Sequence, residues 1–356
     1  MAFPKRYFAI VAVAAAILLY LARTQNYDSW TSEPGGRIPV YSADAAPYTA
    51  AIVYLVSVMP GPRSPDRLLQ SIPLMQKNIP WQHKWPVLLL HAGMYDTAES
   101  QLEFLSRLRD SSEQHGLTPE ATEGLLGRIE FITTHHDLPE GIPADGVADN
   151  PIWSGEWPAY HHMCAFFSYK IFNHPRIKDL TYYLRLDDDS YVRAPGACFD
   201  PFEYMHIHNK SFAFRDDPVD AGWVTEGMWP FVSNYAQNHP EVESTLVHNG
   251  WQWPGGRFWP GPSHKFGEGV NFPSFETNFD LVKVSRFRTP EMMEFLHELA
   301  SDPRRFYWQR WGDAPVRAAE VYMFLDVAEE IHRMCEIPYA HKDRPFEDCE
   351  CVPLAG

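Results

Sequence analysis

The sequence has few basic residues for its length. Its 356 residues include 30 lysines and arginines against 46 aspartates and glutamates, a formal net charge of -16 at pH 7. A protein that binds an extended nucleic acid needs clustered positive charge to neutralise phosphates. The composition therefore argues against nucleic acid as a partner, although it leaves room for a small basic pocket around a phosphate.

Cysteine is also scarce, and no two cysteines have the C-x-x-C spacing that is typical of structural zinc sites. An oxidising compartment would allow the five cysteines to form two disulfides and leave one thiol. They are Cys164, Cys198, Cys335, Cys349 and Cys351. The sequon Asn209-Lys210-Ser211 agrees with such a compartment. Neither an internal repeat nor a second domain boundary is evident, so one large domain is expected.

A long apolar run, residues 7–22, lies near the N-terminus, with Lys5 and Arg6 before it. A membrane-spanning helix needs roughly 20 apolar residues, so the run fits a short anchor or the core of a signal peptide. No clear small-x-small cleavage pattern follows it, which favours a retained signal-anchor. The basic residues predict a cytoplasmic tail at 1–6 and a luminal remainder, and the short run suits the thinner membranes of the early secretory pathway.

The chain after the anchor divides into a polar stem, residues 23–47, and a domain, residues 48–356. Short apolar runs alternate with helical patterns at the start of the domain, which predicts an α/β fold with parallel strands. The predicted strands are 50–56, 86–90, 129–132, 182–186, 275–284 and 337–341. The predicted helices are 66–78, 98–108, 159–172, 290–300 and 314–325, and residues 216–265 are predicted to form long loops.

Three consecutive carboxylates, Asp187 to Asp189, end the apolar run 182–186. Adjacent like charges repel one another and resist burial, so a buried strand with this end most simply stops at a cation. Oxygen ligands suit Mg²⁺ or Mn²⁺, and such ions often hold a phosphate-bearing substrate. The alternative is a solvated acidic turn, which the apolar residues on both sides disfavour.

Other polar residues have both functional and structural interpretations. Alternation along a strand would place Glu276, Asn278 and Asp280 on one face, either in a site or in solvent. Asp313 precedes a helical pattern and suits an N-cap, but a carboxylate there could also orient a sugar hydroxyl or an arginine. His341 ends the last predicted strand and becomes a ligand candidate only if the fold brings it to the triplet. The pair His161 and His162 in Y-H-H-M-C is subject to the same condition.

Several motifs together resemble glycosyltransferase family 15, the Golgi mannosyltransferases best known from fungi. They are Y-H-H-M-C, Y-Y-L-R-L-D-D-D, N-F-D, F-Y-W-Q-R-W-G-D-A-P-V and I-P-Y-A-H, in the family's order, over roughly residues 50–341. The resemblance implies a GT-A-type nucleotide-sugar glycosyltransferase fold, a mixed central sheet flanked by helices. It also implies a Golgi single-pass type II membrane protein that uses Mn²⁺ and GDP-mannose. The implied reaction is retaining transfer of mannose to a mannose-containing glycan, usually through an α-1,2 linkage.

The resemblance also implies roles for individual residues. The metal ligands would be Asp187 and His341, with Asp189 as a further ligand because the triplet replaces the family's usual E-P. The donor site would include Tyr160 and Arg185. The catalytic acid would be Asp280, in a motif that is usually N-F-E. Its side chain here is one methylene shorter, so Glu276 is a possible substitute, and Asp313 would position donor or acceptor hydroxyls.

Two other functions remain compatible with the sequence. A triplet of aspartates followed by an aromatic residue and Val192 also occurs in glycosyltransferases that use UDP-sugars. The tryptophan-rich segment between residues 221 and 265 would also suit a non-catalytic luminal glycan-binding protein. A preference for a UDP-sugar donor would indicate the first function rather than mannose transfer. Metal-dependent nucleotide binding would exclude the second.

Overall fold

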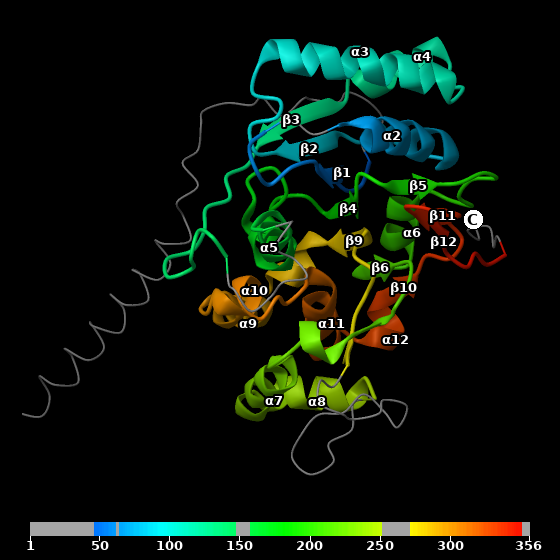
Figure 1. Ribbon diagram of the computed structural model, residues 1–356. Helices are drawn as coiled ribbons and strands as arrows, with labels where there is room; N and C mark the ends of the chain where they lie inside the picture. The colour runs from blue at the N-terminus through cyan, green and yellow to red at the C-terminus, as the bar shows by residue number, and fades with distance from the viewer. Residues whose placement is uncertain (1–45, 62–63, 147–156, 251–270, 351–356) are drawn as a thin grey trace, which may run out of the picture. The chain divides into compact units, whose positions relative to one another are not determined.

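A computed structural model describes residues 46–61, 64–146, 157–250 and 271–350 (Figure 1). The predicted cytoplasmic tail, signal-anchor and nearly all of the stem lie outside these residues. Within the described ranges, no helix is both long and apolar enough to span a membrane. The described residues belong to a single compact unit.

A seven-stranded mixed sheet forms the centre of this unit, with the strand order β10-β6-β9-β4-β1-β2-β3. The parallel half consists of β1 (Ala50–Leu55), β2 (Val87–His91), β3 (Ile129–Thr133) and β4 (Tyr182–Leu186). The other half consists of β9 (Phe279–Lys283), β6 (Phe212–Phe214) and β10 (Ile331–Arg333), and β9 runs antiparallel to both neighbours. Strands β1, β2 and β4 are almost wholly buried, as their unbroken apolar runs predict.

Helices pack around the sheet (Figure 1). Helix α2 (Asp66–Asn78) connects β1 to β2, and α3 (Ala98–Gln114) and α4 (Pro119–Leu126) connect β2 to β3. Thr97 and Thr118 cap α3 and α4 through their hydroxyl oxygens. Around the antiparallel half lie α5 (Ala159–Ala165), α6 (Pro201–Ile207), α9 (Pro290–Ala300), α10 (Arg304–Tyr307), α11 (Asp313–Phe324) and α12 (Val327–Glu330).

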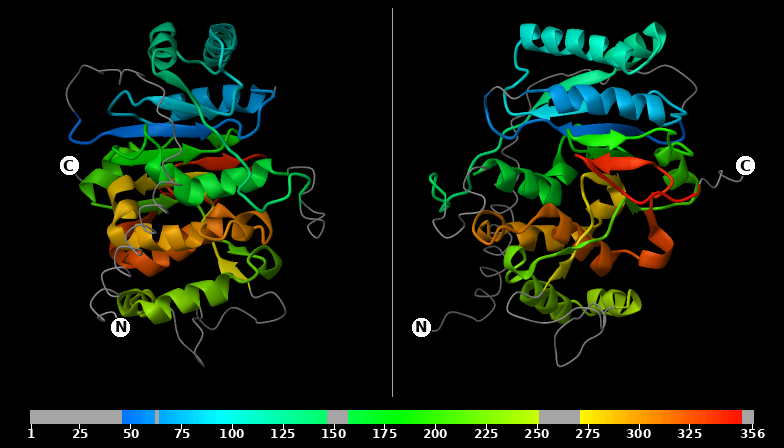
Figure 2. Two further views of the ribbon diagram at one scale, coloured as in Figure 1. Left: turned by 90° about the vertical axis from the view of Figure 1, so that its left-hand side faces the viewer. Right: turned by 45° about the vertical axis from the view of Figure 1, so that its right-hand side comes forward.

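A second, three-stranded sheet brings the C-terminal segment to the end of β4. It contains β5 (Ser190–Val192), β11 (Tyr339–His341) and β12 (Arg344–Pro345), and the views in Figure 2 show the red C-terminal strands beside the green segment that follows β4. In this antiparallel register His341 is opposite Ser190. A residue about 150 positions along the chain from the acidic triplet is therefore held beside it by backbone pairing.

Three sequence predictions need correction. Residues 275–278 are not part of the strand, because β9 begins at Phe279 and residues 277–278 form a turn. The segment predicted as loops contains two helices, α7 (Met228–Asn238) and α8 (Pro240–His248), whose apolar residues pack inward. The helix predicted over 159–172 is helical throughout, but it changes from α to π and then to 3₁₀ geometry. Residues 251–270 lie outside the described part of the chain.

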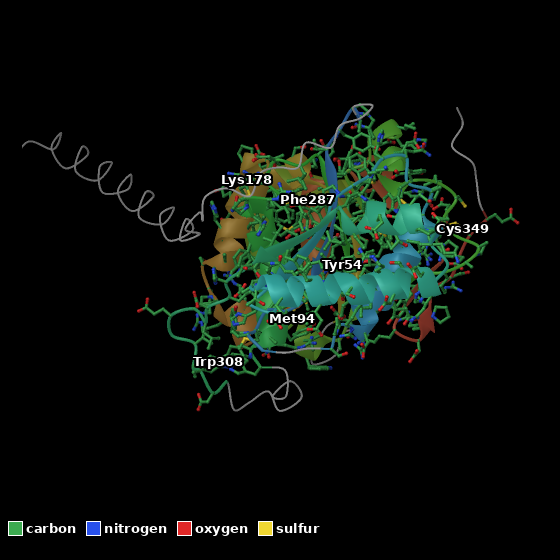
Figure 3. The ribbon with its side chains drawn as sticks, turned by 90° about the horizontal axis from the view of Figure 1, so that it is seen from above. Tyr54, Met94, Lys178, Phe287, Trp308 and Cys349 are labelled. Atoms are coloured by element: carbon green, nitrogen blue, oxygen red, sulfur yellow. A yellow bond between two sulfur atoms is a disulfide. The ribbon has the colours of Figure 1, made fainter. Side chains whose placement is uncertain are left out.

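The cysteines occupy different environments. Cys335 and Cys349 form a disulfide with their Cα atoms 5.2 Å apart, and Cys198 is also disulfide-bonded. Cys164 is a buried free thiol, and Cys351 lies outside the described residues. Figure 3, seen from above, places Cys349 and Trp308 on opposite sides. The Cys335–Cys349 bridge therefore ties the segment after β12 to the side of the molecule away from Trp308.

Candidate functional site

Two carboxylates and an imidazole converge where β4 ends. The side chains of Asp187, Asp189 and His341 each offer a ligand atom, and these atoms all lie within 4.8 Å of one another. The Nε2 atom of His341 is 2.9 Å from a carboxylate oxygen of Asp189. The fold thus satisfies the condition that the sequence set for His341. Two oxygen donors and one nitrogen donor form a set that suits Mn²⁺.

The acidic turn is held from beneath by a buried hydrogen-bond network. The Ser190 hydroxyl accepts from the Asp187 backbone N–H at 3.1 Å and lies 2.6 Å from the Tyr339 hydroxyl. Tyr339 in turn donates to the side-chain oxygen of Asn278 at 2.8 Å. These bonds join β4, β5, β11 and the turn before β9 at a single point. The position of Asp187 is therefore fixed by three segments of the chain that are distant in sequence.

Arg185 occupies the interior behind the triplet. Its Nε and Nη2 atoms donate to Asp187 at 3.2 and 3.1 Å, and its Nη1 atom donates to Asp313. The guanidinium also lies over the Phe167 ring, 3.6 Å from its centroid. Burial raises the pKa of Asp187, and the charge of Arg185 opposes that rise. Arg185 is fully buried and already paired with two carboxylates, so its side chain orients the acids of the site.

Asp313 is not the N-cap that the sequence suggested. The cap of α11 is Gly312, and Asp313 is the first helical residue. Its carboxylate instead accepts from Arg185 and, at 2.7 Å, from the Thr277 hydroxyl. Burial alone would raise the pKa of Asp313, but the charge and hydrogen bond of Arg185 outweigh it and hold the pKa below its usual range. Asp313 is consequently a buried, ionised link between Arg185 and Thr277.

The structure separates the two acids that the sequence placed on one face. Glu276 accepts from the Asn278 amide at 2.7 Å and lies 3.6 Å from Arg344, which follows His341 closely in the chain. Burial raises the pKa of Glu276, and the charges of His341 and Arg344 oppose this. About a quarter of its side chain remains accessible, with a relative exposure of 24%. Glu276 therefore lies on the accessible side of the site, near the metal-binding trio.

Asp280 lies in the interior instead. Its side chain is fully buried, pairs with Arg317 at 3.3 Å and accepts from the Tyr183 hydroxyl at 3.4 Å. Arg317 also pairs with the buried Glu320. Burial raises the pKa of Glu320 to about 8, and Arg317 opposes that rise. The side chain of Asp280 thus belongs to a buried ionic network beneath β4 and α11.

The aromatic and imidazole residues of α5 divide into two groups. The ring of Tyr160 packs against the guanidinium of Arg310, whose central carbon is 4.6 Å from the ring centroid. The Nδ1 atoms of His161 and His162 lie 2.6 Å from the Phe306 carbonyl and 2.6 Å from the Tyr307 hydroxyl, respectively. The two histidines therefore bind α5 to α10, whereas Tyr160 lies close to the start of α11.

Two residues at the site were missed by the sequence reasoning. Arg67, in the first turn of α2, donates to Asp189 at 2.9 Å, with its side chain 61% exposed. Thr277 donates to Asp313. Arg67 lies in the first helix after β1 and could have been suspected as a phosphate ligand, since helix N-termini favour anions. No local signal distinguishes Thr277 from any other polar residue in a turn.

A mixed sheet flanked by helices, with a carboxylate–histidine trio at the end of a central strand, agrees with a glycosyltransferase of the GT-A type. The family model described as glycolipid 2-alpha-mannosyltransferase matches residues 70–354. The chain belongs to this family, glycosyltransferase family 15, as its motifs indicated.

Curated relatives agree with this assignment. The chain is 28% identical over 249 residues to O-glycoside alpha-1,2-mannosyltransferase omh1 of Schizosaccharomyces pombe, covering 65% of this chain and 60% of the relative. It is 26% identical over 211 residues to probable mannosyltransferase KTR4 of Saccharomyces cerevisiae, covering 59% and 44% respectively. The match therefore spans about half the length of these relatives.

Solved structures show the same fold. Core-mannan synthase A (CmsA/Ktr4) of Aspergillus fumigatus, in its Mn/GDP form, matches with a TM-score of 0.63 at 20% identity, over 87% of this chain and 81% of that one. Mannosyltransferase Ktr4p of S. cerevisiae, in complex with GDP, matches with a TM-score of 0.62 at 21% identity, over 86% and 77%. The GT-A-type fold and the mixed sheet are thus confirmed.

Proposed function

We propose that this protein is a metal-dependent retaining mannosyltransferase that transfers mannose from GDP-mannose to a mannose-containing glycan through an α-1,2 linkage. The observation that carries the proposal is the trio Asp187, Asp189 and His341 at the end of β4. Family membership supports mannose transfer, and the Mn/GDP and GDP complexes of related folds support the donor and the metal.

The residues of the trio fit Mn²⁺ in donor chemistry and in spacing. When bound there, the ion supplies Lewis-acid stabilisation of the charge on the departing diphosphate. Arg67 lies beside Asp189 with most of its side chain exposed, so it can add a positive charge on the same side. Arg185 holds Asp187 and Asp313 in fixed positions, which keeps the carboxylates preorganised before the substrate arrives.

We assign the acid that faces the sugar to Glu276. A group that stabilises or attacks the reacting carbon must reach it, and Glu276 is accessible whereas Asp280 is fully buried and paired with Arg317. In this assignment Asp280 has a structural role, because its pairing with Arg317 links β9 to α11. Tyr160 lines the donor side, and Asp313 acts through Arg185 and Thr277.

The direct test is a donor screen on the purified luminal part of the chain. We expect turnover of GDP-mannose with mannose or mannobiose as acceptor, loss of activity in EDTA and recovery with Mn²⁺. Linkage analysis of the product should give an α-1,2 bond with the anomeric configuration retained. Turnover of a UDP-sugar in place of GDP-mannose, or glycan binding without any nucleotide turnover, would contradict the proposal.

We further propose a Golgi location with the domain on the luminal side. The support is in the sequence: basic residues before the apolar run 7–22, and the sequon at Asn209. Asn209 is exposed in the turn after α6, and its side-chain oxygen accepts from Lys283 at 2.9 Å. In a eukaryotic host we expect a gel shift of one glycan after deglycosylation, absent in Asn209→Gln. A full-length protein that carries no glycan, and that added protease digests in sealed membranes, would argue for a cytosolic domain.

A further inference from the structure

An exposed tryptophan lies beside the proposed active site on a segment unrelated to the metal turn. Trp223 is in a single 3₁₀ turn, Gly222–Val224, and 53% of its surface is exposed. The backbone N–H of Gly222 donates to the Asn271 side chain at 3.2 Å, which holds this turn in place. The exposed indole offers a flat apolar face on which a ligand ring can pack.

Trp223 is connected to the site through Arg310. The guanidinium carbon of Arg310 is 5.9 Å from the Trp223 ring centroid and 4.6 Å from that of Tyr160. Arg310 itself is only 8% exposed and has a left-handed backbone, with φ +62°, just before the start of α11. The arginine, three residues before Asp313, therefore lies close to both the indole and the Tyr160 ring.

A carboxylate from the same segment reaches the same place. Asp220 ends the short strand β7 (Val219–Asp220), which pairs antiparallel with β8 (Phe272–Pro273). Burial raises the pKa of Asp220 to about 6; Arg310 opposes the rise, and Asp313 and Glu276 add to it. The segment that carries Asp220 borders the turn that carries Glu276, because the Ser274 backbone N–H donates to the Pro218 carbonyl and the Glu276 backbone N–H donates to the Asp216 carbonyl, both at 2.9 Å.

We propose that Trp223 and Asp220 form a subsite for the acceptor sugar, next to the bond-forming position. A pyranose presents an apolar C–H face and a set of hydroxyl donors. The indole offers a flat apolar surface for the first, and the carboxylate offers acceptor oxygens for the second. Arg310 packs against the Trp223 ring, and its positive charge also acts on Asp220. The inference rests on the proposed function, because it assigns the acceptor of that reaction as a mannose-type pyranose.

The test compares Trp223→Ala, Trp223→Phe and Asp220→Asn with the wild type in steady-state transfer to mannobiose. We expect the acceptor KM to rise about five- to tenfold in Trp223→Ala, the size of effect that loss of one aromatic contact produces, and less in Trp223→Phe. The KM for GDP-mannose and its slow hydrolysis by water should stay within twofold of wild type. Asp220→Asn should raise the acceptor KM in the same way.

The matched control is Leu102→Ala, which truncates a 66%-exposed apolar side chain on α3, the helix beyond the parallel half of the sheet. It should leave both KM values unchanged. An unaltered acceptor KM in Trp223→Ala overturns the subsite, and so does an equal loss of donor hydrolysis, which would indicate a structural role.

Direct binding distinguishes failure of the subsite from failure of the proposed function. Saturation-transfer NMR with mannobiose, in the presence of GDP and Mn²⁺, reports acceptor binding without turnover. Mannobiose binding that is lost in Trp223→Ala supports the subsite even if the donor is not GDP-mannose. Equal binding to wild type and Trp223→Ala refutes it even if the enzyme is an active mannosyltransferase.

Discussion

Replacement of Asp187 by asparagine should reduce mannosyl transfer by about 10²- to 10³-fold, the usual cost of removing one preorganised electrostatic group from an active site. The change keeps the shape of the side chain and a hydrogen-bond acceptor for Arg185, so the fold should persist. The loss should appear together with weaker Mn²⁺ binding, measured by titration of the free ion's electron paramagnetic resonance signal.

Asp188 provides the matched control for this prediction. It is adjacent in sequence and also an aspartate, but it is not part of the trio formed by Asp187, Asp189 and His341. Asp188→Asn should therefore keep Mn²⁺ affinity and transfer within a few-fold of wild type. A folded Asp187→Asn variant with near-wild-type activity would refute the metal assignment, as would equal losses in both variants.

The second large effect should distinguish Glu276 from Asp280. Glu276→Gln should lower the transfer rate by about 10²-fold or more while GDP binding and thermal stability are kept, because the side chain is accessible and acts on the sugar. Asp280→Asn should instead destabilise the fold by about 3 kcal/mol, since it removes a charge that compensates the buried Arg317.

Two measurements on the same pair of variants test this division. Urea denaturation gives the free energy of unfolding, and single-turnover kinetics give the rate of mannose transfer. If Asp280→Asn unfolds at the wild-type urea concentration yet is inactive, and Glu276→Gln is active, the roles are the reverse of those proposed. The double variant should combine the two effects, with the lower transfer rate of Glu276→Gln and the lower free energy of unfolding of Asp280→Asn, because the two residues act through different contacts.

Elements with a strong local signal could be predicted from the sequence. Strands β1, β2, β3 and β4 are apolar runs bounded by turns, and helices α2 and α9 have apolar residues at helical spacing. Helices α7 and α8 were missed because tryptophan, proline and glycine obscure the periodicity of that segment. Their helical state is decided by packing against the rest of the domain rather than by propensity.

Site residues divide in the same way. Asp187 and Asp189 were identifiable because three adjacent carboxylates at a strand end are costly without a cation. Their third partner could not be found from local pattern, since β11 places His341 beside β5 only through long-range pairing. The cap interpretation of Asp313 was also local, and it is wrong because Arg185 and Thr277 compete successfully for the carboxylate.

By itself the sequence determined the family, the α/β class and the acidic end of β4. Each of these depends on short stretches of contiguous residues, which can be recognised without knowing how the chain folds. Only the tertiary structure decided which acids share the site. The strand begins at Phe279, four residues later than predicted, so Glu276 lies outside it on the accessible side while Asp280 is buried against Arg317. The side on which a residue faces depends on where a strand begins, and long-range packing, not local pattern, sets that point.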